Sequence, residues 1–443
     1  MKMQTAELRT QDAPPLAIPL SFFLTAPLAI ALAGGLLLWG GVAVTTSRWL
    51  PITLCLTHLG TLGFLTMVML GALYQVTAVV VGSPVPWLRL AHVVHALFAL
   101  GVAALCWGFA QLGAASLASI SLWLAIGSLG PAILLFLIPL SVALARAQSF
   151  NPTWFGICSA AACFFLAATA GLWIAHGFVG MGFPGPRELW SQVHLGVALL
   201  GWVGCLITAV SWQVVPMFYL AREVPVRIQW TVQSLAVMGA AAPLLLVYFS
   251  SFDAGGASSH GLGRAAALAL APAIVAVWGL HPAATLWSLQ GRRRKRSDGS
   301  LLFWRAGLAL GPVTALAAAA AWGLSSEAWD LAFGWLAIWG WAGMIVHGML
   351  TRIVPFLVWL HRFAPLVGRV PVPSVKKLLP DRWTRIGFAL HLGSLLLGTL
   401  AIATGWDLLS RSTGLALLAT AGMMARSLIH VVRQRPASAS ELD

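Results

Sequence analysis

Eleven histidines stand in a chain in which only 9% of the residues are charged, and most of them fall inside long apolar stretches. An imidazole in hydrocarbon costs free energy unless its nitrogens find partners, so a histidine within a membrane marks a candidate functional site. Neutral imidazole also binds haem iron and copper well. These residue types therefore indicate haem or metal binding, and the alternative for any single histidine is a hydrogen bond between helices.

Two of these histidines occupy nearly equivalent positions before a Gly-aromatic pair. His58 precedes Gly63 by five residues, and His194 precedes Gly201 by seven. At about 1.5 Å per residue, both rings are expected in the outer third of the membrane. A threefold pseudo-axis along the membrane normal would place them at similar depth, on opposite sides of one cleft.

A second pair is expected nearer the middle of the membrane. His347 follows Gly340 by seven residues, at a position where related segments carry Leu70 and Thr208. His391 enters from the inner side on the next apolar stretch and reaches a comparable depth. We therefore predict that His347 and His391 form a reserve pair for a second cofactor.

The leading glycines belong to three segments that are versions of one another. Each segment begins with Gly and an aromatic residue, and a Gln or Arg follows the glycine by twelve residues. The leading glycines are 138 and 139 residues apart, which indicates a block of several helices present in three copies. The segments run from Gly63 to Val76, from Gly201 to Pro216 and from Gly340 to Pro355.

The elements that must position these residues are membrane spans. Hydrophobic residues make up 59% of the chain, and stretches of about 20 or more apolar residues can be cut into twelve spans. We predict an all-α integral membrane protein with three four-helix repeats at 17–146, 150–290 and 300–432, and with cytoplasmic tails at 1–16 and 433–443. The predicted spans are 17–43, 51–80, 88–112, 115–145, 152–179, 190–220, 228–251, 263–290, 303–324, 329–358, 383–404 and 408–432.

The distribution of positive charge predicts the orientation. With the N-terminus in the cytoplasm, four of the 26 Lys and Arg residues lie outside and the other 22 inside. The formal charge of +14 therefore indicates contact with anionic membrane lipid, not nucleic acid. The expected location is a bacterial-type inner membrane, with both termini cytoplasmic. The four outer residues are Arg48, Arg187, Arg264 and Arg411.

Other motifs are excluded by their context. Gly180 to Gly185 matches G-x-G-x-x-G, but no strand precedes it and it lies in an outer turn, so it is not a dinucleotide fingerprint. No phosphate-binding Walker loop and no Cys-x-x-Cys-His motif for covalent haem is present. The five cysteines all lie within predicted spans, where small buried side chains are the ordinary interpretation.

The histidine and glycine pattern resembles subunit I of the haem-copper oxidase superfamily, and within it most resembles the NnrS family of haem- and copper-containing membrane proteins. The stretches from His58 to Phe64 and from Gly340 to Arg352 carry this resemblance. It implies a non-covalent b-type haem, copper as a further cofactor, and chemistry linked to nitric oxide or respiratory electron transfer. The implied partners are a redox protein, a gas such as nitric oxide, and other membrane subunits.

Departures from that superfamily limit what the resemblance implies. Its oxidases carry a histidine pair on the seventh helix, whereas 228–251 here contains no histidine. They also carry two neighbouring histidines on the tenth helix, where the interior here has His347 alone, and Tyr219 lies at the wrong end of its helix to replace their tyrosine. The full oxidase copper site is therefore not expected.

The resemblance then suggests roles for the remaining residues. We expect His58 to bind haem iron, and His194 to bind either haem iron or copper, with His176 as a nearby outer partner. His347 is a further candidate metal ligand. Arg352 takes the place of Gln in the third segment, where it could pair with a haem propionate or extend to the inner headgroups.

Two alternative functions need no haem. Twelve spans with a basic inner side are also typical of secondary transporters, although those usually show two related halves. A cofactor-free subunit that assembles beside a respiratory complex is the other alternative. A red preparation with a Soret band would favour haem, and a colourless stable one would favour the alternatives.

Overall fold

The computed structural model of the protein describes residues 14–112, 115–182, 187–250, 259–293, 298–324 and 326–436. Regular structure within these residues is helical throughout. Most of both predicted tails, the basic residues 294–296 and the side chain of His260 lie outside this description.

Twelve helices in the described part of the chain are long and apolar enough to cross a membrane, and they agree with the twelve predicted spans. The chain is therefore a multi-pass membrane protein. In order, the spans comprise α1 (Ala17–Gly40) with η2 (Gly41–Thr45); α2 (Pro51–His58), η3 (Leu59–Thr66), α3 (Met67–Val76) and η4 (Thr77–Val81); α4 (Leu90–Ala110); α5 (Ala115–Ala145); α6 (Pro152–His176) with η5 (Gly177–Met181); α7 (Arg187–Leu195), η6 (Gly196–Gly204) and α8 (Cys205–Tyr219); α9 (Val226–Ser250); α10 (Ser259–Ala269), α11 (Ala271–Ile274), η7 (Val275–Leu280) and α12 (His281–Gln290); α13 (Gly299–Leu324); α14 (Glu327–Trp335), η8 (Leu336–Gly343) and α15 (Met344–Arg362); α16 (Asp381–Thr404); and α17 (Asp407–Arg433).

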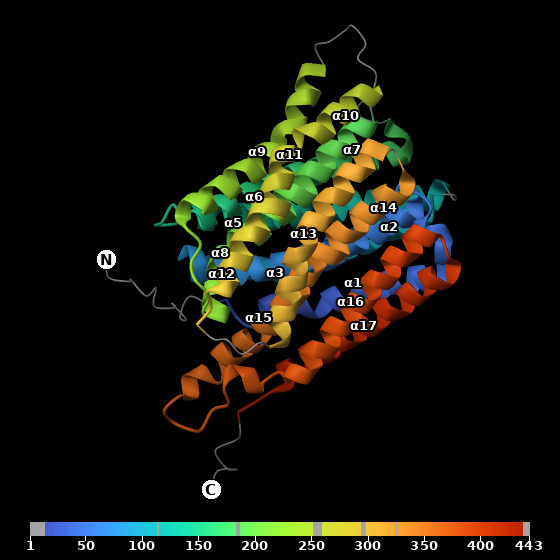
Figure 1. Ribbon diagram of the computed structural model, residues 1–443. Helices are drawn as coiled ribbons and strands as arrows, with labels where there is room; N and C mark the ends of the chain where they lie inside the picture. The colour runs from blue at the N-terminus through green and yellow to red at the C-terminus, as the bar shows by residue number, and fades with distance from the viewer. Residues whose placement is uncertain are drawn as a thin grey trace.

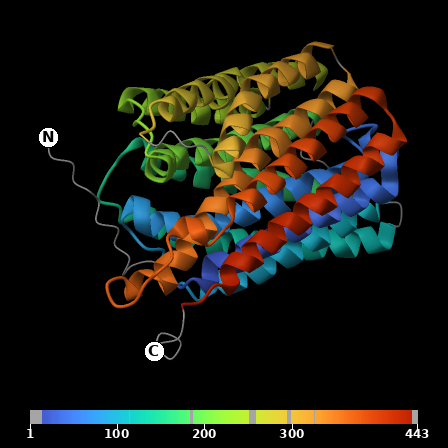
Figure 2. The same ribbon diagram turned by 60° about the horizontal axis from the view of Figure 1, so that its bottom comes forward.

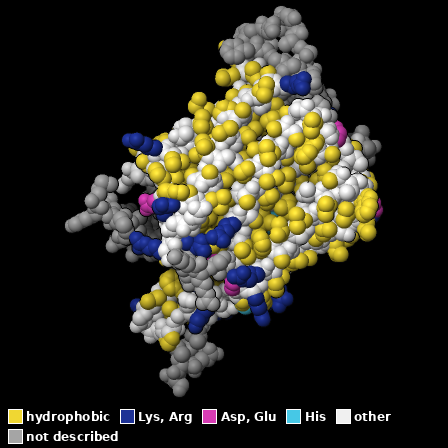
Figure 3. Space-filling model, viewed as in Figure 1, with side chains coloured by type: hydrophobic (Ala, Val, Ile, Leu, Met, Phe, Trp, Pro, Cys, Tyr) yellow, Lys and Arg dark blue, Asp and Glu magenta, His cyan; other side chains and the backbone are white. Residues whose placement is uncertain are grey.

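The spans lie side by side in one bundle (Figure 1), and their even number brings the start of α1 and the end of α17 to the same end (Figure 2). Figure 3 shows hydrophobic side chains over most of one flank and Lys and Arg mostly toward the end where α15 and α16 are joined. Leu268 and Leu316 on the flanks are 73% and 71% exposed. Apolar surface of this extent needs lipid around it.

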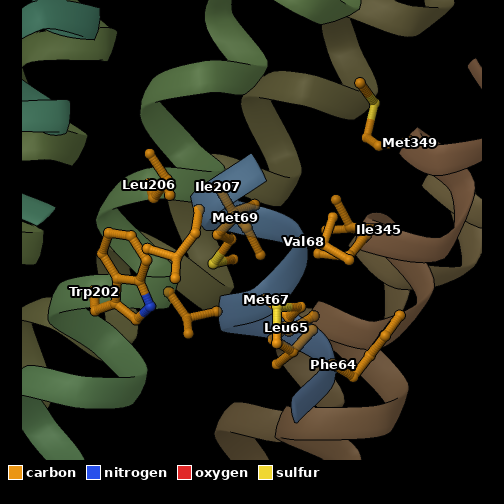
Figure 4. Packing of buried hydrophobic residues seen from close by; sticks show 14 of the residues in the cluster. Phe64, Leu65, Met67, Val68, Met69, Trp202, Leu206, Ile207, Ile345 and Met349 are labelled. Carbon is orange, nitrogen blue, oxygen red and sulfur yellow. The ribbon is translucent and has the colours of Figure 1, made fainter. Parts of the chain in front are cut away.

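The second, sixth and tenth spans meet at the centre of the bundle. Figure 4 shows Phe64 to Met69 of the second span between Trp202 of the sixth and Ile345 of the tenth. The indole Nε1 of Trp202 donates to the hydroxyl of Thr66 at 3.0 Å. The rings of Phe64 and Trp339 lie 6.0 Å apart. The three spans that carry the repeated segments are therefore in direct contact.

Small residues let neighbouring spans approach closely. A Cβ at Gly71 would lie 2.7 Å from the Cβ of Phe22 on α1, and one at Gly348 would lie 2.5 Å from the Cβ of Phe303 on α13. Both distances are too short for any side chain. These glycines are therefore required where the second and tenth spans pack against the spans that precede them.

The same three central spans share a local irregularity. Each contains a π-helical segment, η3, η6 or η8, and each segment includes one of the leading glycines Gly63, Gly201 and Gly340. Shorter π-helical segments occur at η4, η5 and η7. Such segments are rare in helices and are frequent at functional sites. They widen the helix, so the side chains beyond them face a different direction from that of an unbroken α-helix.

Candidate functional site

His58 at the end of α2 and His194 near the end of α7 face each other across the boundary between the second and sixth spans. Their ring centroids lie 6.4 Å apart, and the ring planes differ by 24°. Two imidazoles bound to opposite sides of one metal ion have centroids about 6 Å apart, because each metal–nitrogen bond is about 2 Å long. The observed separation is close to that value.

Backbone carbonyls fix the orientation of both rings. Nδ1 of His58 donates to the carbonyl of Leu54 at 2.7 Å, and Nδ1 of His194 donates to the carbonyl of Ala167 at 3.1 Å. In each neutral ring Nε2 then holds the lone pair, and no other residue described by the structure hydrogen-bonds to it. Metal-binding histidines usually have this arrangement, with one ring nitrogen anchored and the other free to coordinate.

The walls around this pair are aromatic and small. The ring of Phe109 on α4 lies 5.4 Å from that of His58, and Phe178 lies 5.9 Å from Phe109. A Cβ at Gly171 on α6 would lie 2.8 Å from Cε1 of His194. Glycine is thus needed at this position for the His194 ring to lie where it does.

Two arginines lie toward the end of the bundle opposite the one where α1 begins and α17 ends. The guanidinium groups of Arg48 and Arg187 lie 4.6 Å and 4.7 Å from the ring of Trp49. Arg187 precedes His194 by seven residues, so it lies about 10 Å nearer that end of the bundle. Arg48 also pairs with Asp330 at 3.4 Å. The distribution of Lys and Arg predicts that both arginines lie outside, but it does not predict that both contact the ring of Trp49.

The predicted reserve pair is in direct contact. Nδ1 of His347 on α15 and Nδ1 of His391 on α16 lie 3.0 Å apart, and Nε2 of His391 donates to the carbonyl of Trp339 at 3.0 Å. Trp339 also stacks on His391, with ring centroids 3.8 Å apart and planes 9° apart. Both histidines are buried. Trp339 lies within η8, and its stacking on His391 was not predicted.

Arg352 lies about midway along α15 and has polar partners there. It pairs with Asp298 and donates from Nε to the hydroxyl of Ser300 at 2.7 Å. Burial alone would raise the pKa of Asp298, but Arg352 and hydrogen bonds from Ser300 and Leu301 outweigh it, so the pKa lies below its ordinary value. The structure therefore gives Arg352 a carboxylate partner within this chain. These groups line a polar cavity of about 260 Å³.

The remaining histidines have other contacts. His176 packs against Trp123 of α5, with ring centroids 4.8 Å apart, and this is a different neighbour from the expected His194. Buried His281 accepts from or donates to the hydroxyl of Ser211 at 2.8 Å. Within the described residues, no three His, Cys, Asp or Glu side chains are grouped to hold a metal ion. A site formed by His58 and His194 would thus have two protein ligands.

An apolar cavity lies beside Trp339, the residue that stacks on His391. It has a volume of about 100 Å³ and lies between α1, the second span, α14 with η8, α16 and α17. Thr57 and Gly60 of the second span are among its lining residues.

Comparison with known proteins adds no identification. A scan against protein-family models finds no match, and a search of curated proteins finds no similar sequence.

Proposed function

We propose that this protein is a haem-binding membrane redox protein linked to nitric oxide or respiratory electron-transfer chemistry. The observation that carries the proposal is the His58–His194 pair, with its 6.4 Å ring separation and its two anchored Nδ1 atoms. Two histidines without a third protein ligand suit haem iron, whose other four ligands come from the macrocycle.

The residues around the pair fit such a group. Gly171 leaves space for the His194 ring, and Phe109 and Phe178 supply apolar aromatic walls. Arg48 and Arg187, on the outer side, are suitable partners for carboxylates such as haem propionates. A haem held by His58 and His194 would supply one-electron transfer. The chain's own residues orient the two imidazoles through the carbonyls of Leu54 and Ala167.

Copper is a second candidate cofactor in this proposal. Neutral imidazole suits copper, and His347 with His391 is the pair that would offer it two nitrogens. Their nitrogens are now joined by a hydrogen bond, so a metal there would replace the shared proton. The redox partner and any associated subunits would meet the protein in the plane or at the surface of the membrane.

The proposal also includes three four-helix repeats and cytoplasmic termini in a bacterial-type inner membrane. The equivalent π-helical segments η3, η6 and η8 support a triplicated architecture, since each contains one leading glycine. The excess of Lys and Arg on one side supports the orientation.

The test compares His58→Ala and His194→Ala with the parent protein by optical spectrum and haem content after purification. Loss of an axial ligand should change the haem spin state or empty the site. His281→Ala is the control, because His281 is a histidine of the bundle interior whose ring is already bonded to Ser211. A colourless parent protein, or unchanged spectra in both variants, would overturn the assignment. A colourless but stable parent protein would favour the transporter and assembly-subunit alternatives.

A further inference from the structure

The apolar cavity between the first, second, tenth, eleventh and twelfth spans has walls of alkyl and indole groups. Ala33, Ala401 and Leu417 are among its lining residues, and Trp335 and Trp339 form one side of it. A Cβ at Gly398 would lie 2.4 Å from the Trp335 ring, so glycine is what allows this indole to occupy the wall. A Cβ at Gly414 would lie 2.5 Å from the carbonyl of Gly34, which shows how closely α1 and α17 pack beside it.

The polar atoms in these walls have partners elsewhere. The hydroxyls of Thr53, Thr57 and Thr413 donate to the carbonyls of Val44, Thr53 and Leu409. The hydroxyl of Thr45 donates to the carbonyl of Val42 and lies 3.5 Å from that of Ser410.

The two indoles in the wall are satisfied in the same way. Nε1 of Trp335 donates to the carbonyl of Leu395, and Nε1 of Trp339 donates to the hydroxyl of Ser394. A buried water needs two to four polar partners, and these donors are already used. The cavity therefore offers water no free hydrogen-bond donor from these groups, although it is large enough for several water molecules.

Its size limits what can bind. A dry engineered cavity of about 150 Å³ binds benzene or xenon, whereas sites for cofactors and drug-sized ligands take about 300–1,000 Å³. At about 100 Å³, this cavity has room for a small neutral molecule and not for a haem or a quinone with its tail.

We propose that this cavity binds one small, uncharged apolar molecule of diatomic to xenon size within the membrane. Such a molecule partitions into hydrocarbon and needs no polar partner, so burial alone retains it. Trp339 separates the cavity from His391, on which it stacks, and Thr57 is the neighbour of His58 in the chain. A molecule held here would lie against Trp339, on the other side of which is His391. The inference that the cavity stores a gaseous substrate such as nitric oxide rests on the proposed function. The inference that the cavity binds a small apolar molecule does not depend on that function.

The probe is xenon, followed by ¹²⁹Xe NMR on the purified full-length protein in detergent. The parent should show one saturable site. Ala33→Leu and Ala401→Leu place three extra carbons in the cavity and should each weaken xenon binding at least tenfold. Ala103→Leu makes the same change at an exposed position on α4 and should leave binding unchanged. Leu417→Ala enlarges the cavity and should strengthen binding, which keeps the test valid if a filling variant fails to fold.

The optical spectrum of the same samples separates this inference from the proposed function. Saturable xenon binding that the filling variants abolish would support the cavity site, even in a colourless protein. A parent that shows no saturable site, or variants at Ala33 and Ala401 that bind as the parent does, would overturn it.

Discussion

Nδ1 of His347 and Nδ1 of His391 lie 3.0 Å apart, and their neighbours determine which nitrogen carries each proton. Because Nε2 of His391 faces the carbonyl of Trp339, it must carry a proton and donate it. Nδ1 of neutral His391 is then an acceptor, so Nδ1 of His347 is the donor. This leaves Nε2 of His347 with a lone pair, beside a cavity of about 10 Å³ that reaches Met424 and Ser427.

This proton assignment predicts two different neutral tautomers. Nitrogen-15 NMR of histidine-labelled protein should show the Nδ1–H form for His347 and the Nε2–H form for His391, identified by removing each residue in turn. A proton found on Nδ1 of His391 would contradict the assignment of His347 as the donor and His391 as the acceptor. A stoichiometric metal that depends on both residues would show that the pair coordinates an ion instead.

The same pair should contribute to stability. His391→Ala leaves the Trp339 carbonyl and the His347 Nδ1–H buried without their partner, which costs about 1–3 kcal/mol for each group. His92→Ala at an exposed position of α4 should change stability by no more than about 0.5 kcal/mol. Denaturant or thermal unfolding in detergent measures both. Equal effects of the two variants would contradict a structural role for the pair.

Gly171 should control the position of the His194 ring. In Gly171→Ala the new Cβ would lie 2.8 Å from Cε1 of His194, so the ring must move and its bond to Ala167 must weaken. The haem spectrum should change in the direction seen for His194→Ala. Gly130→Ala is the matched control, because its Cβ would meet only Leu172 at 3.7 Å. A normal spectrum in Gly171→Ala would show that the ring position does not matter for the cofactor.

Asp298 should make stability depend on pH in the acid range. Because Arg352 holds the folded-state pKa of Asp298 below its ordinary value near 3.9, the contribution is complete above that value and is lost as pH falls through the lower one. Asp298→Asn should therefore cost about 1–3 kcal/mol at pH 7, and the difference from the parent should shrink as the pH falls below about 4. An exposed pair offers the comparison, since Arg385→Gln should cost about 0.5 kcal/mol or less. A difference that is constant down to pH 2 would exclude this linkage.

The twelve spans could be predicted because crossing a membrane requires about 20 apolar residues, and such stretches can be recognised directly in the sequence. Depth could also be counted along each span, which is why His347 and His391 were expected at a similar level. The directions in which the side chains face could not be predicted in the same way. Each extra residue in a π-helical turn rotates the remainder of the span by about 100°, and η3, η6 and η8 have no simple sequence signature.

Contacts between side chains from distant segments also could not be predicted from the sequence. Asp298 precedes α13, and nothing in its local sequence indicates that it reaches Arg352, 54 residues later. The Ser211–His281 bond joins the sixth and eighth spans across 70 residues. Each of these two contacts depends on how the spans pack against one another, and this packing cannot be derived from a single sequence.

Orientation determines every assignment of depth, and cysteine labelling can test it. The native cysteines lie within the spans, and four of the five are buried, so a membrane-impermeant maleimide should report mainly on a newly introduced cysteine. In intact cells Thr46→Cys, at the end of the first span, should be labelled, and Lys377→Cys, between the tenth and eleventh spans, should be protected until the cells are opened. The reason is the 22 basic residues expected on the cytoplasmic side. The opposite pattern would place both termini outside and move His58 and His194 to the inner third of the membrane.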